Sequence, residues 1–150
     1  MPLQYQIDCS RGLVICRGTG ELTDDQWFEF FNLLHSDPDF DPTFDELVST
    51  QEVTDNRVTP NGIRRAVELN KFTAPSKRAF VVATKYAYGM SRMYQTMLEP
   101  SMSIVQVYEN MSDAVAWLEL DSDFDFAAVF ADSEILIADQ HDDGFRRNPG

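Results

Sequence analysis

The chain has 150 residues, 43% of them hydrophobic, and carries 25 acidic against 12 basic side chains, a formal net charge of −13. A chain of this length and composition forms a single-domain core without help from disulfides or metal. The negative charge argues against nucleic acid or an anionic membrane as the main partner, because both would be repelled over most of the surface. No apolar run approaches the roughly 20 residues of a membrane span. The first residues lack the basic and apolar regions of a signal peptide, so we expect a cytoplasmic protein.

Two short runs at the start of the chain, 3–9 and 13–19, predict a β-hairpin. A two-residue turn at 11–12 would place Cys9 and Cys16 on the same face of this hairpin. They would then lie diagonally, roughly 7–8 Å apart, too far for an unstrained disulfide. The hairpin therefore predicts two buried free thiols.

The next two helices have clear start signals. Thr23 followed by Gln26 forms a capping box, and an aromatic stripe follows it to Leu34. Thr59 followed by Pro60 starts the second helix. Between them, 46–49 reads as a short strand.

The rest of the first 120 residues continues the alternation of strands and helices. The runs 79–84 and 104–108 predict strands, and Ser112 predicts the cap of a fourth helix. The order β-β-α-β-α-β-α-β-α predicts an α/β fold. We expect a mixed sheet of about five strands, with an antiparallel hairpin first, mainly parallel strands after it, and four helices.

The third helix is expected over 86–97, with four large side chains facing inward: Met90, Met93, Tyr94 and Met97. Methionines at this spacing are typical of core filling. If the stripe instead lines a cavity, its adaptable thioethers would suit an apolar ligand.

The segment 121–150 differs in character from the 1–120 domain. It holds eight acidic residues and two arginines, a net charge of −6. It also holds several large apolar groups, among them Phe124, Phe130 and the run 135–137. We expect this acidic extension to dock in part on the domain or on a second copy, with disorder from about His141.

The order of elements supports a family resemblance. The opening hairpin, the capped aromatic helix and the segment Thr59–Pro60–Asn61–Gly62–Ile63 resemble the STAS domain of bacterial anti-sigma factor antagonists. The strand 77–82 and the helix 86–94 look more like uncharacterised bacterial relatives of that group. The resemblance covers roughly the first 120 residues. It implies the STAS-like fold and a cytoplasmic, partner-binding function.

The phosphorylation motif of that family is altered in this chain. In the family, the second helix opens with Asp-Ser-Ser-Gly, and a partner kinase phosphorylates the serine before the glycine. Gly62 matches this motif, but Asn61 stands at the serine position and Thr59 at the acid position. The resemblance therefore does not carry over the phosphorylation switch, and whether Thr59 substitutes as an acceptor stays open.

Charge is segregated along the chain. Residues 21–55 hold eleven acidic side chains and no lysine or arginine, whereas 57–92 hold eight basic side chains and the single acid Glu68. A negative and a positive face would suit the orientation of a protein partner or head-to-tail self-association. The alternative is that each block is a solvated face and that the two neutralise one another in the fold.

Two loops at helix starts form the candidate site. In parallel α/β folds, ligands lie beyond the carboxyl ends of strands, where helix N-termini point backbone N–H groups outward. The candidate ligand- or partner-binding residues at these two corners are Arg57, Thr59, Asn61, Gly62, Lys85, Tyr88, Gly89 and Arg92. We expect an anion- or partner-recognition surface there. The alternative is that the tyrosines cover the helix entry and that Arg92 pairs with a surface acid.

Other chemistries have weaker support. The run Asp37-x-Asp39-x-Asp41 starts like a calcium loop, but Pro42 and Val48 stand where such a loop needs glycine and glutamate. Two scattered cysteines and two histidines do not form a zinc site, and no nucleophile has a base beside it. We therefore expect no catalytic residues, no metal and no cofactor. The expected function is a non-enzymatic domain that docks a protein partner or itself, with a homodimer included. The alternative is a protein that binds a small anionic or lipid-like molecule between the third helix and the sheet.

Overall fold

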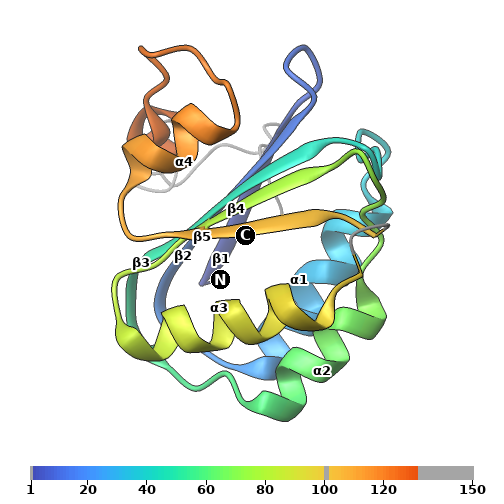
Figure 1. Ribbon diagram of the computed structural model, residues 1–150, viewed down its shortest axis with the longest axis vertical. Helices are drawn as coiled ribbons and strands as arrows, with labels where there is room; N and C mark the ends of the chain where they lie inside the picture. The colour runs from blue at the N-terminus through green and yellow to red at the C-terminus, as the bar shows by residue number, and fades with distance from the viewer. Residues whose placement is uncertain (1, 100–101, 132–150) are drawn as a thin grey trace, which may run out of the picture.

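The computed structural model describes residues 2–99 and 102–131. Over residues 3–117, five strands and four helices alternate in the predicted order (Figure 1). They are β1 (Leu3–Asp8), β2 (Leu13–Leu22), α1 (Asp24–Ser36), β3 (Asp45–Asn56), α2 (Pro60–Leu69), β4 (Lys77–Val81), α3 (Lys85–Met97), β5 (Ile104–Tyr108) and α4 (Met111–Trp117). This confirms the expected α/β fold.

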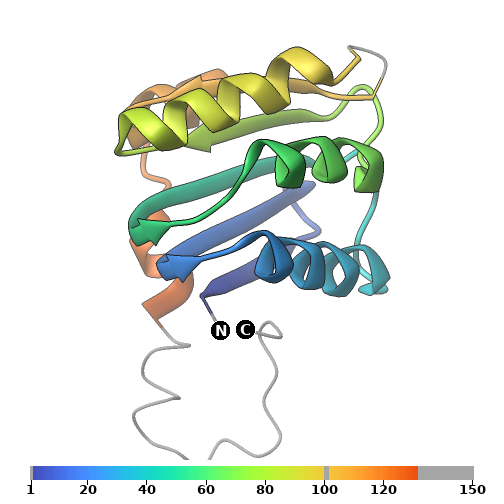
Figure 2. The same cartoon turned by 90° about the horizontal axis from the view of Figure 1, so that it is seen from below.

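The sheet has the simple order β1-β2-β3-β4-β5. The pair β1–β2 is antiparallel, and every later pair is parallel, as the sequence predicted. Helices α1, α2 and α3 cover one face, while α4 lies on the other (Figure 2). Because β2, β3 and β4 are parallel, the helices that follow them all start at one edge of the sheet. We call this edge the carboxyl rim.

Side-chain caps start the helices at the rim. The Thr23 hydroxyl accepts from the Gln26 amide, and the Gln26 side chain accepts from the Thr23 backbone, which confirms the capping box. The Thr59 hydroxyl accepts from the Gly62 backbone at the start of α2, and the Thr84 hydroxyl accepts from the Ala87 backbone at the start of α3, both without the reciprocal bond of a capping box. Each cap satisfies a backbone N–H that has no partner inside the helix.

The cap of α4 differs from the expected one. Asn110 accepts from the Asp113 backbone, whereas Ser112 lies inside the first turn and donates its hydroxyl to Asn110. Serine and asparagine both favour the N-cap position of a helix. Here Asn110 is the N-cap, and its side chain accepts from the Asp113 N–H three residues on.

The hairpin turn is longer than predicted. Tyr5 pairs with Cys16 and Asp8 pairs with Leu13, so the loop spans 9–12 rather than two residues. The Asp8 carboxylate accepts from the Arg11 backbone, which holds the loop. Cys9 therefore lies exposed in this loop, and only Cys16 is a buried thiol. The prediction of two buried thiols was wrong for Cys9.

Strand β3 extends far beyond the predicted 46–49. Its first half is buried and its second half is largely exposed, yet pairing with β2 continues to Leu22 and Asn56. Hydropathy detects the buried half alone, because backbone hydrogen bonds extend the strand where apolar side chains stop. The extension carries the β3–α2 loop to the rim.

The first part of the acidic extension completes a second core. Residues 126–131 are helical, and Phe130 is fully buried against Leu13, Ile15 and their neighbours on the α4 face. The Arg17 guanidinium lies 4.9 Å from the centre of the Phe130 ring. The run 135–137 and the expected disorder from His141 lie outside the described residues. Among the described residues, no helix is long and apolar enough to cross a membrane.

Candidate functional site

The two predicted corners meet at the carboxyl rim. Strands β3 and β4 are parallel neighbours, so the loops that follow them leave the sheet at the same edge. The Tyr86 hydroxyl, at the start of α3, donates a hydrogen bond to the Val58 carbonyl in the loop before α2. This hydrogen bond links the two corners directly, in agreement with the prediction that parallel strands bring them to one edge of the sheet.

The chain's own carboxylate occupies the first corner. Asp24 of α1 accepts from the Thr59 backbone at 2.9 Å and from the Thr59 hydroxyl at 2.5 Å. The Thr59 hydroxyl in turn accepts from the Gly62 backbone at 3.0 Å. The start of α2 favours a negative charge, and Asp24 already supplies it. Asp24 therefore stands where the sequence analysis expected an external anion.

Arg57 and Asn61 are also engaged within the chain. The Arg57 guanidinium lies 2.9 Å from Asp55 and 3.4 Å from Glu21, and the hydrogen bond to Asp55 is the main cause that raises the pKa of Arg57. Asn61 accepts from the Arg64 side chain. At this corner the acidic and basic blocks of the sequence neutralise one another, as the alternative interpretation held.

A side chain at Gly62 would displace the Asp24 carboxylate. A Cβ atom at this position would lie 1.9 Å from Asp24 Oδ1. Gly89, by contrast, has open space, with nothing within 4 Å of its Cβ position. The two glycines therefore serve different purposes: Gly62 admits the Asp24 carboxylate, whereas Gly89 leaves the backbone of α3 bare at the surface.

Alanine substitutions distinguish these two glycines. We expect Gly62→Ala to lower the free energy of unfolding by about 1–3 kcal/mol, because the added methyl displaces Asp24. We expect Gly89→Ala to raise it by about 0.5–1 kcal/mol, because alanine is favoured over glycine within a helix. Urea denaturation of both variants checks this, and equal effects would contradict the assignment.

The second corner has exposed cations and a hollow. Lys85 and Arg92 are exposed, and Arg92 donates to the Tyr88 hydroxyl at 3.3 Å. Among the described residues, no acid pairs with Arg92. No partner is found for the Lys85 ammonium in the described parts of the chain. A hollow of about 460 Å³ opens beside it, lined by Gln51, Val82, Ala83, Thr84, Lys85, Tyr88 and Glu109.

A second, apolar cleft lies beneath α2 and α3. Its volume is about 60 Å³, and its walls include Trp27, Ile63, Phe80 and Met90. The expected inward stripe of α3 is only partly right, since Met97 is 38% exposed at the end of the helix.

A residue with a buried polar atom borders this apolar cleft. Thr50, on β3, lines it, and the buried Thr50 hydroxyl has no hydrogen-bond partner among the described residues. A buried hydroxyl without a partner is costly, so Thr50 is an unsatisfied polar position in the wall beside the cleft. The sequence analysis did not single out Thr50, because a threonine in a strand carries no distinctive pattern.

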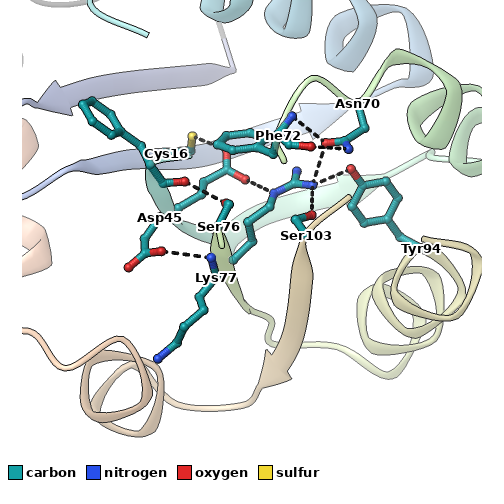
Figure 3. Close-up of polar contacts among 11 residues, drawn as sticks. Cys16, Asp45, Asn70, Phe72, Ser76, Lys77, Tyr94 and Ser103 are labelled. Atoms are coloured by element: carbon teal, nitrogen blue, oxygen red, sulfur yellow. Dashed lines mark hydrogen bonds and ion pairs between the residues drawn. The ribbon is translucent and has the colours of Figure 1, made fainter. Parts of the chain in front are cut away.

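The structure also shows a buried charged pair that the sequence analysis missed (Figure 3). Arg78 is 1% exposed and Glu46 is 2% exposed, with 2.9 Å between Arg78 Nε and Glu46 Oε1. The same guanidinium donates to Tyr94 at 2.8 Å and to Asn70 at 3.1 Å. Although burial lowers it, the pKa of Arg78 stays above its ordinary value because Tyr94 and Glu46 stabilise the charged form.

Arg78 belongs to the basic block 57–92 of the sequence, yet it lies in the core. In the sequence, Glu46 and Arg78 each stand directly before an apolar run. In the structure, they are register partners on the adjacent parallel strands β3 and β4. The Cys16 thiol donates to Glu46 at 3.3 Å. Burial, and then the nearby Glu46 carboxylate, raise the pKa of this thiol well above its ordinary value, so it remains protonated.

His35 lies apart from both rim corners. Its ring stacks on Phe31 with 5.9 Å between centroids and contacts Phe40 at 5.0 Å. Burial, with smaller contributions from the cations of Arg78 and Lys71, lowers its pKa to about 4. In the described ranges, no group of three His, Cys, Asp or Glu side chains is arranged to hold a metal ion.

Comparison with known proteins identifies the fold. The sequence matches no family model and no curated protein. Among solved structures, the chain is similar to an uncharacterised DUF3478-family protein with a SpoIIAA-like fold from Shewanella loihica PV-4. The TM-score is 0.52 at 16% sequence identity, over 77% of this chain and 93% of that chain. The chain has the SpoIIAA-like α/β fold, which confirms the resemblance to STAS domains at the level of fold.

Proposed function

We propose that this chain is a non-enzymatic regulatory domain that docks a segment of a partner protein into the hollow at the start of α3. The observation that carries the proposal is the hollow itself, about 460 Å³ in volume, with the exposed Lys85 ammonium on its wall. The N-terminus of α3 adds a partial positive charge at the same place. An acidic side chain of a partner fits this end of the hollow.

The chemistry of the walls favours a peptide over a simple anion. Glu109 lines the hollow together with Lys85, so the hollow presents both signs of charge. Gly89 exposes bare backbone on the same helix, which permits close approach of another chain. A protein segment with an acidic group and a hydrogen-bond donor matches this surface, whereas free phosphate matches only part of it.

The docking we propose requires no phosphorylation. The position that carries the phosphorylated serine in the family holds Asn61, and the Thr59 hydroxyl is engaged with Asp24. A carboxylate within the chain thus fills the place at the start of α2, which leaves the α3 corner for the partner.

Charge reversal at the α3 corner tests this proposal. We expect Lys85→Glu with Arg92→Glu to abolish capture of one specific protein when the tagged chain is used as bait in an extract of its native host. The matched control is Arg64→Glu with Lys71→Glu, which makes the same charge change at exposed positions on and after α2. Quantitative mass spectrometry of the captured proteins provides the readout. Identical capture by the two double variants would overturn the proposal.

The apolar cleft supports a second candidate, a binding site for a small molecule. Its volume of about 60 Å³ is close to that of two water molecules. A larger apolar ligand therefore requires α2 and α3 to separate. Asp24 lies at the cleft and disfavours an anionic head group, so we propose a neutral, mainly apolar ligand. Separation of α2 and α3 would also uncover the buried Thr50 hydroxyl, which then hydrogen-bonds the ligand.

Thermal denaturation with decan-1-ol and decanoate tests the second candidate. A ligand that binds only the native state raises the melting temperature. We expect decan-1-ol to raise it more than decanoate does. We expect Thr50→Val to stabilise the unliganded protein by about 1 kcal/mol, because an unpaired hydroxyl is removed, and to reduce the shift with decan-1-ol. A shift with decan-1-ol that Thr50→Val leaves unchanged would contradict the role of the hydroxyl.

A further inference from the structure

Strand β5 forms one border of the sheet, and no strand among the described residues pairs with its outer edge (Figure 2). The Ile104 amide donates to the Ser76 carbonyl, and the Tyr108 carbonyl accepts from Val82, so these two residues point their polar backbone groups toward β4. Successive residues of a strand point these groups to opposite sides. The backbone N–H and C=O groups of Val105 and Val107 therefore point away from the sheet.

The outer edge of β5 is only partly covered. The Gln95 side chain of α3 donates to the Val105 carbonyl at 2.6 Å. For the outward groups of Val107, the described residues provide no hydrogen-bond partner. An open row of such groups is a template on which another strand can pair.

Exposed apolar side chains gather near the start of this strand. Five large hydrophobic residues are exposed among those that the structure describes, and three of them lie here: Met97, Met102 and Ile104. Ile104 is 44% exposed although it belongs to a strand of the central sheet. Apolar surface concentrated beside an open edge is typical of an interaction site.

We propose that β5 pairs with β5 of a second copy of this chain, antiparallel, about a two-fold axis that passes through Gln106. This register places Ile104 opposite Tyr108 of the second copy, Val105 opposite Val107 of the second copy, and Gln106 opposite its own equivalent. Aliphatic–aromatic and β-branched pairs directly opposite one another stabilise antiparallel strands. The sequence of the strand is thus complementary to itself.

The charge distribution favours a second copy at this edge and at this register. Residues 102–108 carry no charge in a chain with a net charge of −13, so repulsion between two copies is weakest here. In the register centred on Gln106, Glu109 faces Ser103 of the second copy rather than another acid. If the two-fold axis passed through Val107 instead, Glu109 would lie opposite the apolar Val105 of the second copy. The inference does not depend on docking at the rim.

Disulfide cross-linking tests the register. The backbone groups of Gln106 face β4, so its pair across the axis is of the non-hydrogen-bonded type, with Cα atoms about 4.5 Å apart. That spacing suits a disulfide. The Ile104 residues of the two copies would lie about 13 Å apart. Ile104 of one copy lies opposite Tyr108 of the other, so an offset of four residues along the strand separates the two Ile104 positions. Both cysteine variants are made in a Cys9→Ser background because Cys9 is exposed.

We expect the Gln106→Cys variant to form a disulfide-linked dimer under mild oxidation at least about tenfold faster than the Ile104→Cys variant, because only its sulfur atoms meet at the axis. Equal rates overturn the proposal, whether the cause is a different interface or occasional collision. In such a case an extended segment of another protein becomes the alternative occupant of the edge.

Sedimentation velocity over a wide range of protein concentrations tests association independently of cysteine chemistry. We expect a monomer–dimer equilibrium for the unmodified chain, and loss of the dimer in Ile104→Lys. The matched control is Leu33→Lys, an equally apolar residue that is 39% exposed on α1, and it should still dimerise. A chain that stays monomeric throughout, or a dimer that survives Ile104→Lys, overturns the proposal.

Discussion

Replacing Arg78 by methionine lowers the free energy of unfolding by about 3–5 kcal/mol, because it leaves the Glu46 carboxylate buried without its partner. Glu46 is 2% exposed, and the Cys16 thiol is its remaining side-chain partner among the described residues. Tyr94 and Asn70 lose a donor in the same substitution. Urea denaturation at neutral pH measures the loss.

The double variant Glu46→Met with Arg78→Met is the control for this prediction. We expect it to recover most of the lost stability, since two apolar side chains replace two buried charges and no carboxylate stays unpaired. Because the residues are in contact, the two single effects do not add. A double variant as unstable as the sum of the singles, or a single Arg78→Met variant that loses less than about 1 kcal/mol, would contradict the described pairing.

Truncating Phe130 to alanine destabilises the protein by about 3–5 kcal/mol, because it empties a fully buried aromatic position. Phe130 is 0% exposed and packs in the core between the sheet and α4. The Arg17 guanidinium, 4.9 Å from the ring centre, loses its aromatic contact as well. Thermal and urea denaturation measure the effect.

Phe124→Ala serves as the matched control for this second prediction. Phe124 lies in the same segment and contacts the same core, but it is only partly buried. We expect a clearly smaller loss there. If Phe124→Ala costs as much stability as Phe130→Ala, then the packing of residues 121–131 differs from the described arrangement.

Local sequence signals predicted the elements wherever the chemistry is local. The capping box at Thr23 and the Thr59–Pro60 start are correct because a cap involves residues three positions apart. The parallel order of the later strands follows from the alternation of strands and helices, which leaves few other topologies. The same argument correctly brought the loops before α2 and α3 to one rim.

Partners distant in sequence account for the errors at the candidate site. Asp24 fills the start of α2 from 35 residues away, and no local pattern around Thr59 indicates it. Arg78 lies among basic residues in the sequence, yet the register of β3 and β4 places it opposite Glu46 in the core. Charge counted along the chain does not reveal which charges are opposite one another.

The amino-acid sequence by itself determined the elements, their order and the direction of the strands, because helix caps, apolar periodicity and short connections act over a few residues. Only the tertiary structure decided which groups remain available for function. Packing paired Arg57 with acids and buried Arg78. In the described chain it left Lys85, the Thr50 hydroxyl and the outward backbone groups of Val107 without partners. The physical reason is that desolvation and pairing depend on neighbours in space, and strand register sets these neighbours.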